Sequence, residues 1–465
     1  MLRIDLLPDD ILLETFDFFM KGRPIVLEKR IVETWQLLVH VCRRWRNLVF
    51  QSPRRLNLQL YCTPKTPTKD RLDVWPALPL LVRGVMTTSS TVCTDNVIAA
   101  LGQNNRVHEV SLSGFVGWQL EKVLAAMQVP FPKLTVLELC SNSKTSSVVS
   151  DSFLGGSAPY LRILELYSIS FPGLPKLLLS ANHLLVLHLD HIPHSGYISP
   201  EAMVAPLSVL SGLKTFSLGF QSPQSRPDSE SRSLPPPKRS ILPSLATFRF
   251  KGATEYLEEL LARIDTPQLH EMIITFFNQI DFDCPRLAQF INCTPTFRSL
   301  HEAHLQFDHD HSTANIKFTS WKSEFPFGDL RIDIPCREPD WQLSSFEQVC
   351  NSLRPLTTIE DLYIEHQYSR LVWKSDAIEN TLWLELLLSF TAVRNLYLSK
   401  EFAPDVAAAL QELTGRRITE VLPSLRNIFV EELEPLGAFQ ENIWQLTGPP
   451  LLSDHPIDIS ESVWK

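Results

Sequence analysis

The chain has 465 residues, of which 44% are hydrophobic and 20% are charged, which is ordinary for a folded protein. That length exceeds one compact core, so we expect one or two domains together with an elongated one. The formal net charge of −9 excludes a general attraction to nucleic acid, and the richest apolar run, 382–390, is too short to span a bilayer.

The beginning of the chain and its cysteines both bear on its compartment. Acidic residues begin at Asp5, before any apolar run, which argues against a signal peptide. The eight cysteines are scattered without a C-x-x-C pair, so we interpret them as free thiols in a reducing compartment. We therefore expect a cytoplasmic or nuclear protein that engages neither a membrane nor nucleic acid.

The first predicted element is a short helix that begins near Pro8. Proline suits the first helical position, and Asp9 and Asp10 favour the positive end of the helix dipole. Apolar residues at helical spacing then give the helix one apolar face: Ile11, Leu12, Phe16 and Phe19.

A second, longer helix is predicted to run from Ile31 to Val49, before Ser52-Pro53. Its apolar stripe steps by three and four residues through Ile31, Trp35, Leu38, Cys42, Trp45 and Val49. Such short helices cannot bury so many aromatic side chains against one another. Part of this face must therefore pack on the following domain or on a partner.

Two sequence motifs in this region carry a resemblance. LPDDIL at 7–12, followed by VCRRWRNLVFQSPRRLNL at 41–58, resembles an F-box, the three-helix module that docks on the Skp adaptor of SCF-type ubiquitin ligases. The segment between Phe19 and Val41 is longer than usual, and we expect the first interhelical loop to absorb it. The resemblance implies adaptor binding through Leu7, Pro8, Ile11, Leu12, Phe16, Leu38, Val41, Cys42 and Trp45. The alternative is a helical cap that seals a larger domain.

From Val107 onward, the chain repeats a short strand pattern written L-x-x-L-x-L. Twelve copies follow one another at spacings of 23 to 34 residues, the last being Leu425, Ile428 and Val430. This period is typical of leucine-rich-repeat solenoids, in which repeats bury their apolar sides by stacking. The predicted fold is α/β, an N-terminal three-helix F-box followed by an irregular leucine-rich-repeat horseshoe with parallel strands on its concave face.

The predicted domain boundaries follow from these patterns. They are an F-box at 1–62, a connecting segment at 63–106, the solenoid at 107–432, and a C-terminal cap or tail at 433–465. Within the solenoid, 221–240 is rich in proline and serine and is predicted to be a disordered loop. A second loose stretch is expected at 308–329.

The resemblance extends over most of the chain. WPALPLLV at 75–82, SGYISPEA at 195–202 and EYLEELLARIDTPQLHEMIITFFNQ at 255–279 are similar to the expanded F-box families of mushroom-forming fungi. That resemblance implies a non-enzymatic substrate-recognition subunit of an SCF-type ubiquitin ligase. Its expected partners are a Skp-type adaptor, a cullin scaffold and an unknown protein target. The alternative is a leucine-rich-repeat scaffold that is not coupled to ubiquitylation.

Catalytic and metal motifs are weak. His301, His304, Asp308 and 309–311 could supply zinc or manganese ligands, but His301 and His304 fall on opposite faces of a strand. We interpret this stretch as a solvated polar loop. With no nucleophile elbow, P-loop or dinucleotide motif, we expect no catalytic residue, no metal and no cofactor.

Target binding is predicted on the concave sheet face, at the residue between the last two apolar positions of each repeat. These positions are Ser111, Glu138, Glu165, His188, Ser217, Arg249, Ile273, His304, Arg331, Tyr363, Tyr397 and Phe429. The last three are aromatic, and Asp361, Glu365 and Glu431 flank them as an acidic rim. Exposed aromatics in a row favour an interface, unless residues 439–452 cover them.

Overall fold

The computed structural model divides into two compact units, Met1–Tyr197 and Ile198–Lys465. The described residues are 7–20, 25–27, 30–32, 34–86, 91–115, 117–141, 148–225, 239–277, 284–298, 300–308, 313–320, 328–336, 338–366, 379–413, 420–430 and 458–461. Among them, no helix combines the length and the apolar character needed to cross a membrane.

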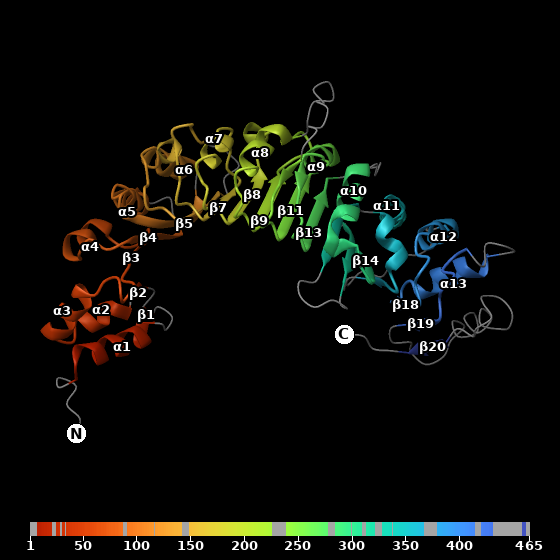
Figure 1. Ribbon diagram of the computed structural model, residues 1–465, viewed down its shortest axis with the longest axis horizontal. Helices are drawn as coiled ribbons and strands as arrows, with labels where there is room; N and C mark the ends of the chain where they lie inside the picture. Colours follow the sequence, from red (N-terminus) through yellow and green to blue (C-terminus); the bar gives the residue numbers. More distant parts are fainter. Residues whose placement is uncertain are drawn as a thin grey trace. The chain divides into compact units, whose positions relative to one another are not determined.

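A helical module opens the first unit (Figure 1). Its elements are α1 (Asp9–Met20), β1 (Ile25–Leu27), β2 (Arg30–Val32), α2 (Thr34–Val39) and α3 (Arg43–Gln51). The strands β1 and β2 pair as an antiparallel hairpin between α1 and α2. This hairpin lies in the segment between Phe19 and Val41.

The prediction of a single helix from Ile31 to Val49 is wrong. The chain leaves the helix after α2, and Cys42 adopts an extended conformation with φ −158° and ψ 171°. The Cys42 Sγ then accepts a hydrogen bond from the Trp45 backbone N–H at 3.5 Å and caps α3. Hydrophobic spacing missed this break because apolar residues continue at steps of three and four across it, although Ile31 lies in β2 and Cys42 is exposed.

The helical module packs against the chain that follows it. Trp35 is only 4% exposed, and its ring meets Trp75 edge-on with centroids 5.0 Å apart. Its Nε1 donates a hydrogen bond to the Gln59 carbonyl oxygen at 2.9 Å. This contact confirms that part of the apolar stripe predicted for residues 31–49 packs against the chain that follows it.

The first unit continues as a parallel sheet whose strands follow chain order. They are β3 (Leu60–Cys62), β4 (Leu80–Val85), β5 (Val107–Phe115), β6 (Val136–Ser141), β7 (Ile163–Tyr167) and β8 (Val186–Ile192). The intervening helices are α4 (Thr68–Val74), α5 (Thr91–Leu101), α6 (Gly117–Ala126), η2 (Phe153–Gly156), α7 (Leu174–Leu178) and η3 (His194–Gly196). The sheet therefore begins at Leu60 and includes part of the predicted connecting segment 63–106. The strands β3 and β4 lack the full repeat pattern, although Leu80 and Val82 of β4 are fully buried.

The second unit contains a longer sheet. Its strands, in spatial order, are β9 (Thr215–Phe220), β11 (Thr247–Gly252), β13 (Glu271–Phe276), β16 (Asp329–Pro335), β15 (Thr313–Thr319), β14 (Glu302–Asp308), β17 (Asp361–His366), β18 (Asn395–Leu398), β19 (Asn427–Val430) and β20 (Asp458–Glu461). A short parallel pair, β10 (Ser240–Ile241) and β12 (Ile264–Asp265), lies outside this sheet. β20 belongs to the predicted C-terminal cap or tail.

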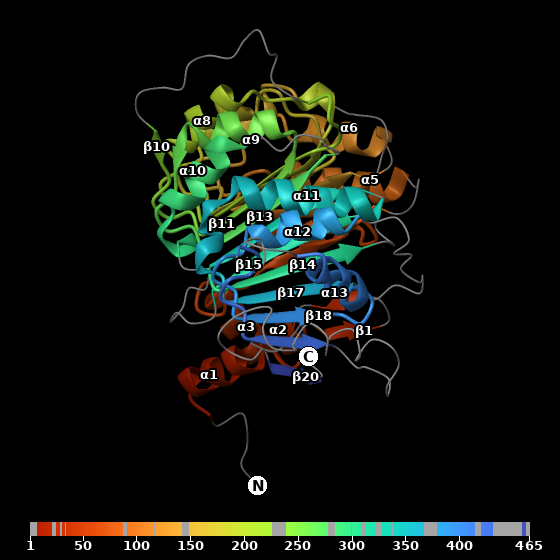
Figure 2. The same ribbon diagram turned by 90° about the vertical axis from the view of Figure 1, so that its right-hand side faces the viewer.

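Helices join these strands on one face of the sheet, as Figures 1 and 2 show for α11 and α12. They are α8 (Pro200–Leu207), α9 (Thr254–Leu261), α10 (Pro285–Cys293), η5 (Pro295–Phe297), α11 (Pro339–Ser352), η6 (Arg354–Thr358), α12 (Asn380–Leu388) and α13 (Ala403–Gln411). The repeat leucines point toward the helices. Leu269, Met272 and Ile274, for example, are all completely buried.

One strand of the second unit runs against the rest. β15 pairs antiparallel with both β14 and β16, whereas β14 pairs in parallel with β17 and β16 pairs in parallel with β13. The prediction that all strands are parallel is therefore wrong here, and part of the stretch 308–329 that was interpreted as loose is this strand. Ala314, Ile316 and Phe318 alternate as buried residues of β15, and such alternation carries no direction.

The predicted loop 221–240 is ordered at both ends. Ser225 is fully buried and donates its backbone N–H to the Ser222 carbonyl oxygen at 3.3 Å, while Ser240 opens β10. Residues 226–238 lie outside the described residues, so disorder there stays a prediction.

Candidate functional site

The first candidate surface is the apolar face of the helical module. Four large apolar side chains are exposed on it: Ile11 at 50%, Phe18 at 83%, Phe19 at 42% and Val41 at 60%. Beside them lies a depression of about 250 Å³. Its walls are Thr15, Phe16, Phe19, Leu37, Leu38, Val41 and Trp45. We call these residues, together with Ile11 and Phe18, the apolar face.

The structure sorts the predicted adaptor-binding residues by exposure. Pro8, Ile11, Val41 and Cys42 are exposed, Leu7 and Trp45 are half-buried, and Leu12, Phe16 and Leu38 are buried. Leu12 is only 1% exposed and does not line the depression, so it supports α1 from inside the module. Phe18 and Leu37 were missed because both fall off the predicted stripes. The adjacent pair Phe18-Phe19 was the available signal, since one helix cannot bury both neighbours equally.

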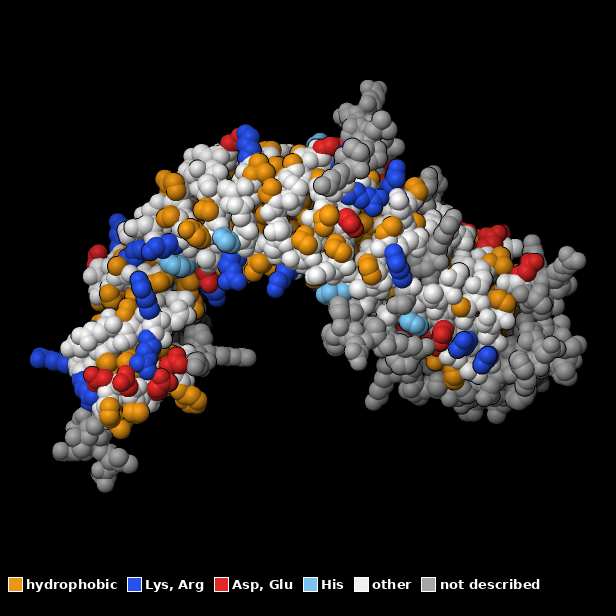
Figure 3. Space-filling view, viewed as in Figure 1, with side chains coloured by type: hydrophobic (Ala, Val, Ile, Leu, Met, Phe, Trp, Pro, Cys, Tyr) orange, Lys and Arg blue, Asp and Glu red, His pale blue; other side chains and the backbone are white. Residues whose placement is uncertain are grey.

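Ion pairs tie α1 to α3 and to the turn after it. Arg44 bonds the Asp9 carboxylate and the Leu7 carbonyl oxygen, both at 2.6 Å, and Arg55 pairs with Glu14 at 2.6 Å. Figure 3 shows acidic side chains over α1 with hydrophobic side chains beside them. Because these pairs are exposed, each contributes little to the free energy of unfolding.

The second candidate surface is an aromatic ladder on the open face of the second sheet. Strand register aligns His304, Tyr363, Tyr397 and Phe429 on neighbouring strands. The ring centroids are 4.3, 4.2 and 4.7 Å apart in that order, with interplanar angles of 5°, 6° and 14°. This confirms the expectation that the last three aromatic positions lie side by side. The rings are face to face, so the ladder offers mainly ring edges and hydroxyl groups to a partner.

Burial raises the pKa of the Tyr363 hydroxyl, and nearby Tyr397 and acidic groups raise it further. The pKa of the Tyr397 hydroxyl is raised by burial as well, so both hydroxyls of the ladder are neutral at physiological pH. Burial would also raise the pKa of Glu365, but hydrogen bonds from His304 and Gln306 outweigh it and lower that pKa.

The residues predicted to form an acidic rim around the ladder are only partly exposed. Asp361 is 9% exposed and accepts a hydrogen bond from Asn395 Nδ2 at 2.6 Å. Glu365 accepts from Gln306 Nε2 at 2.9 Å, with His304 Nδ1 at 3.3 Å. These carboxylates lie between strands and bond their neighbours, which sequence spacing does not reveal. Glu431 lies outside the described residues.

The remaining predicted positions of the sheet face are half-buried or exposed, apart from Ser217, which is 6% exposed. In the second unit, the arginine side chains at these positions form ion pairs with neighbouring carboxylates. Arg249 meets Glu271 at 3.0 Å, and Arg331 meets Asp333 at 2.9 Å.

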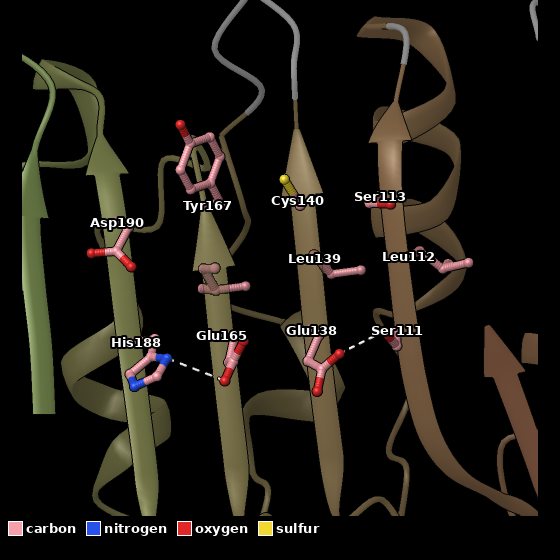
Figure 4. A pocket seen from close by; sticks show the side chains of 11 residues that line it. Ser111, Leu112, Ser113, Glu138, Leu139, Cys140, Glu165, Tyr167, His188 and Asp190 are labelled. Carbon is pink, nitrogen blue, oxygen red and sulfur yellow. Dashed lines mark hydrogen bonds and ion pairs between the residues drawn. The ribbon is translucent and has the colours of Figure 1, made fainter. Parts of the chain in front are cut away.

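The first unit has a different arrangement, which we call the acidic depression (Figure 4). It has a volume of about 270 Å³. Its lining residues come from β5 to β8: Ser111, Leu112, Ser113, Glu138, Leu139, Cys140, Glu165, Leu166, Tyr167, His188 and Asp190. Ser111 Oγ donates to Glu138 at 2.5 Å, and His188 Nδ1 lies 3.1 Å from Glu165.

Glu138 and Glu165 are direct register partners on neighbouring parallel strands. Like charges placed opposite each other destabilise a sheet. We therefore expect Glu138→Gln, which retains an acceptor for Ser111, to raise the free energy of unfolding by about 0.2–1 kcal/mol. Denaturant unfolding followed by circular dichroism measures this. Glu121→Gln, on the exposed surface of α6, is the control and should change little; equal effects of the two variants would contradict the repulsion.

The candidate metal ligands do not come together in the part of the chain that the structure describes. His304 stacks on Tyr363, and 309–311 lie outside that part. No group of three or more His, Cys, Asp or Glu side chains suited to a metal ion occurs among the described residues.

No protein-family model and no curated protein sequence matches the chain. Among solved structures, it is similar to the leucine-rich repeat-containing protein LegL7 from Legionella pneumophila at 14% sequence identity and a TM-score of 0.26. The alignment covers 84% of this chain and 98% of that chain. The fold is therefore assigned from the chain's own repeats and strand register: it is an α/β leucine-rich-repeat-like protein with a mostly parallel sheet and an N-terminal helical module.

Proposed function

We propose that this chain is the substrate-recognition subunit of an SCF-type ubiquitin ligase, without a catalytic site or cofactor of its own. The helical module docks on a Skp-type adaptor, which connects it to a cullin scaffold. The open sheet face holds the target protein. The subunit then acts by proximity, because it raises the effective concentration of the target near the ubiquitin-loaded partner.

The observation that supports adaptor docking is the apolar face. Ile11, Phe18 and Val41 are each at least half exposed, on a module that already has a buried core of its own. Contiguous exposed apolar side chains typically mark an interaction site. The depression beside them is lined almost wholly by apolar and aromatic side chains, which suits an apolar anchor from the adaptor.

Target binding is supported by the chemistry of the sheet face. Among the described residues, helices cover the other face of the sheet. The open sheet face carries half-buried aromatic rings in one unit and carboxylates in the other. Such surfaces are suited to protein recognition.

Ile11→Asp combined with Val41→Asp tests the docking. A carboxylate buried in an apolar interface loses its hydration, so adaptor affinity is expected to fall by about 2–4 kcal/mol, a loss on the order of 30- to 1,000-fold. The measurement is the dissociation constant of purified full-length protein with a recombinant Skp-type adaptor. Both sites are exposed, so circular dichroism should remain unchanged.

Val74→Asp combined with Val92→Asp is the matched control, because these valines are 71% and 63% exposed on α4 and α5. That variant should bind the adaptor normally. If wild-type protein does not bind the adaptor at all but still captures a target, the chain is a protein-binding scaffold that is not coupled to ubiquitylation.

A further inference from the structure

The strand of the last repeat, β19, has a neighbour from the predicted C-terminal cap or tail. β20 pairs with it in parallel at the end of the sheet (Figure 1). Across β17, β18 and β19, register aligns equivalent residues in four rows. These rows are Asp361, Asn395 and Asn427 (the amide row); Leu362, Leu396 and Ile428 (the first core row); Tyr363, Tyr397 and Phe429 (the ladder row); and Ile364, Leu398 and Val430 (the second core row). The rows define which residue type a following strand needs at each position to continue the pattern.

β20 matches these rows poorly. Ile459 keeps the first core row apolar. Ser460 is in register with Phe429 but has no ring to extend the ladder row. Glu461 is in register with Val430, in a row whose other members are apolar and at most 2% exposed. β20 therefore breaks both the aromatic pattern and the second apolar pattern of the strands beside it.

The amide row adds a third mismatch. Asn427 Nδ2 donates a hydrogen bond to Asn395 Oδ1 at 2.7 Å, and Asn395 Nδ2 donates to Asp361 Oδ1 at 2.6 Å. These bonds run in one direction, so the next residue continues the row only by donating to Asn427 Oδ1. β20 places Asp458 at this position, and an ionised aspartate accepts hydrogen bonds but does not donate them. An asparagine at the same position would continue the row.

The aromatic ladder ends at the same edge. Phe429 is half-buried and stacks on Tyr397, with ring centroids 4.7 Å apart and an interplanar angle of 14°. Because the ladder runs across the strands, the second face of the Phe429 ring is turned toward the strand position that Ser460 holds. An aromatic residue at that position would stack on this face as Tyr397 does on the other. The edge of β19 thus suits a strand with an asparagine, an apolar residue, an aromatic residue and an apolar residue in that order.

We propose that the edge of β19 binds an extended segment of the target protein in place of β20. The segment pairs in parallel with β19 and carries the residue types that the four rows require. In strand addition of this kind, main-chain hydrogen bonds supply affinity and alternate side chains supply specificity. β20 is then an internal competitor that shields the edge from unspecific pairing and yields to a better-matched strand. The proposal rests on the proposed function, because it specifies which part of the target the sheet recognises.

The first part of the test compares peptides on full-length protein by fluorescence polarisation. The probe is a labelled Gly-Ser peptide that contains Asn-Leu-Tyr-Leu, the sequence of β18. One control peptide contains Asp-Ile-Ser-Glu, the sequence of β20. The other contains Asn-Tyr-Leu-Leu, which has the composition of the probe but places the ring in a core row. We expect the probe to bind at least about tenfold more tightly than either control.

The second part changes β20 in opposite directions. Ile459→Pro combined with Ser460→Pro weakens its pairing, because one of two consecutive N–H groups in a parallel strand bonds each neighbour. This variant should bind the probe at least about tenfold more tightly than the unchanged protein. Ser460→Tyr combined with Glu461→Leu improves the match of β20 and should weaken probe binding. The matched control is Ser240→Pro combined with Ile241→Pro in β10, which lies outside this sheet and should leave probe affinity unchanged.

Equal binding of the probe and the peptide of the same composition would overturn the proposal. So would unchanged probe affinity in both β20 variants, or a gain in the control variant as large as in the proline variant of β20. The tyrosine–leucine variant removes no main-chain donor, so the test does not depend on how well the proline variant folds. Adaptor affinity is measured on the same proteins, so a failure here with normal adaptor binding leaves the proposed function standing.

Discussion

Replacing Trp383 with alanine is expected to lower the free energy of unfolding by about 3–5 kcal/mol. Trp383 lies on α12 and is completely buried. Its ring contacts Phe307 of β14 and Phe402, with centroids 5.9 and 5.8 Å away. Phe307 also meets Phe346 of α11 at 4.8 Å. The cavity would therefore open where helices and sheet share one aromatic cluster, and this rigid cluster cannot collapse fully to fill it.

Guanidinium unfolding followed by far-ultraviolet circular dichroism measures the effect without relying on tryptophan emission. Trp383→Phe is the matched control and should cost much less. It keeps most of the ring volume, and it removes an indole N–H that has no hydrogen-bond partner among the described residues. A loss below about 1 kcal/mol for the alanine variant would show that this cluster is not a centre of stability.

Replacing Tyr397 with alanine is expected to weaken target capture by about 2–4 kcal/mol, on the order of 30- to 1,000-fold. Tyr397 is the ring between Tyr363 and Phe429 in the aromatic ladder. Its loss would separate the two neighbours and remove the edge and hydroxyl that they hold in place. The target is first identified by affinity purification with the proteasome blocked, and its affinity is then measured with purified proteins.

Two variants make this result specific. Tyr397→Phe preserves the stacked rings and should keep more of the affinity than alanine does. Ile273→Ala alters a half-buried apolar residue of the same row on β13, away from the ladder, and should change affinity little. If Tyr397→Ala binds the target fully while Glu165→Gln abolishes capture, recognition lies in the first unit rather than at the ladder.

The strand positions followed from the sequence where repeats are consecutive. Leu137, Leu164 and Leu187 align in register, as regular repeats require. The adjacency of Tyr363, Tyr397 and Phe429 follows for the same reason. The adjacency of His304 and Tyr363 does not follow from the sequence, because the copy that contains Arg331 lies between them along the chain. In the sheet, the antiparallel strand β15 lies between β14 and β16, so Arg331 of β16 is on the side of β14 away from β17.

Burial was harder to predict than position. Leu12 and Asp361 were both assigned to binding surfaces, yet the structure buries them within the helical module and the sheet. A helical or strand period assigns a residue to a face, but whether another element covers that face depends on contacts distant in sequence.

The spacing of apolar side chains is a local property of helices and strands, so the sequence alone predicts that a helical module precedes a leucine-rich-repeat-like array, and which of the described repeat residues enter the core. The break at Cys42 and the antiparallel course of β15 are known only from the tertiary structure. It also decided that the ladder rings stack face to face and that Glu138 faces Glu165 without a lysine or arginine in the depression they share. Strand direction and the neighbours of a charge depend on long-range pairing, for which a one-dimensional period holds no information.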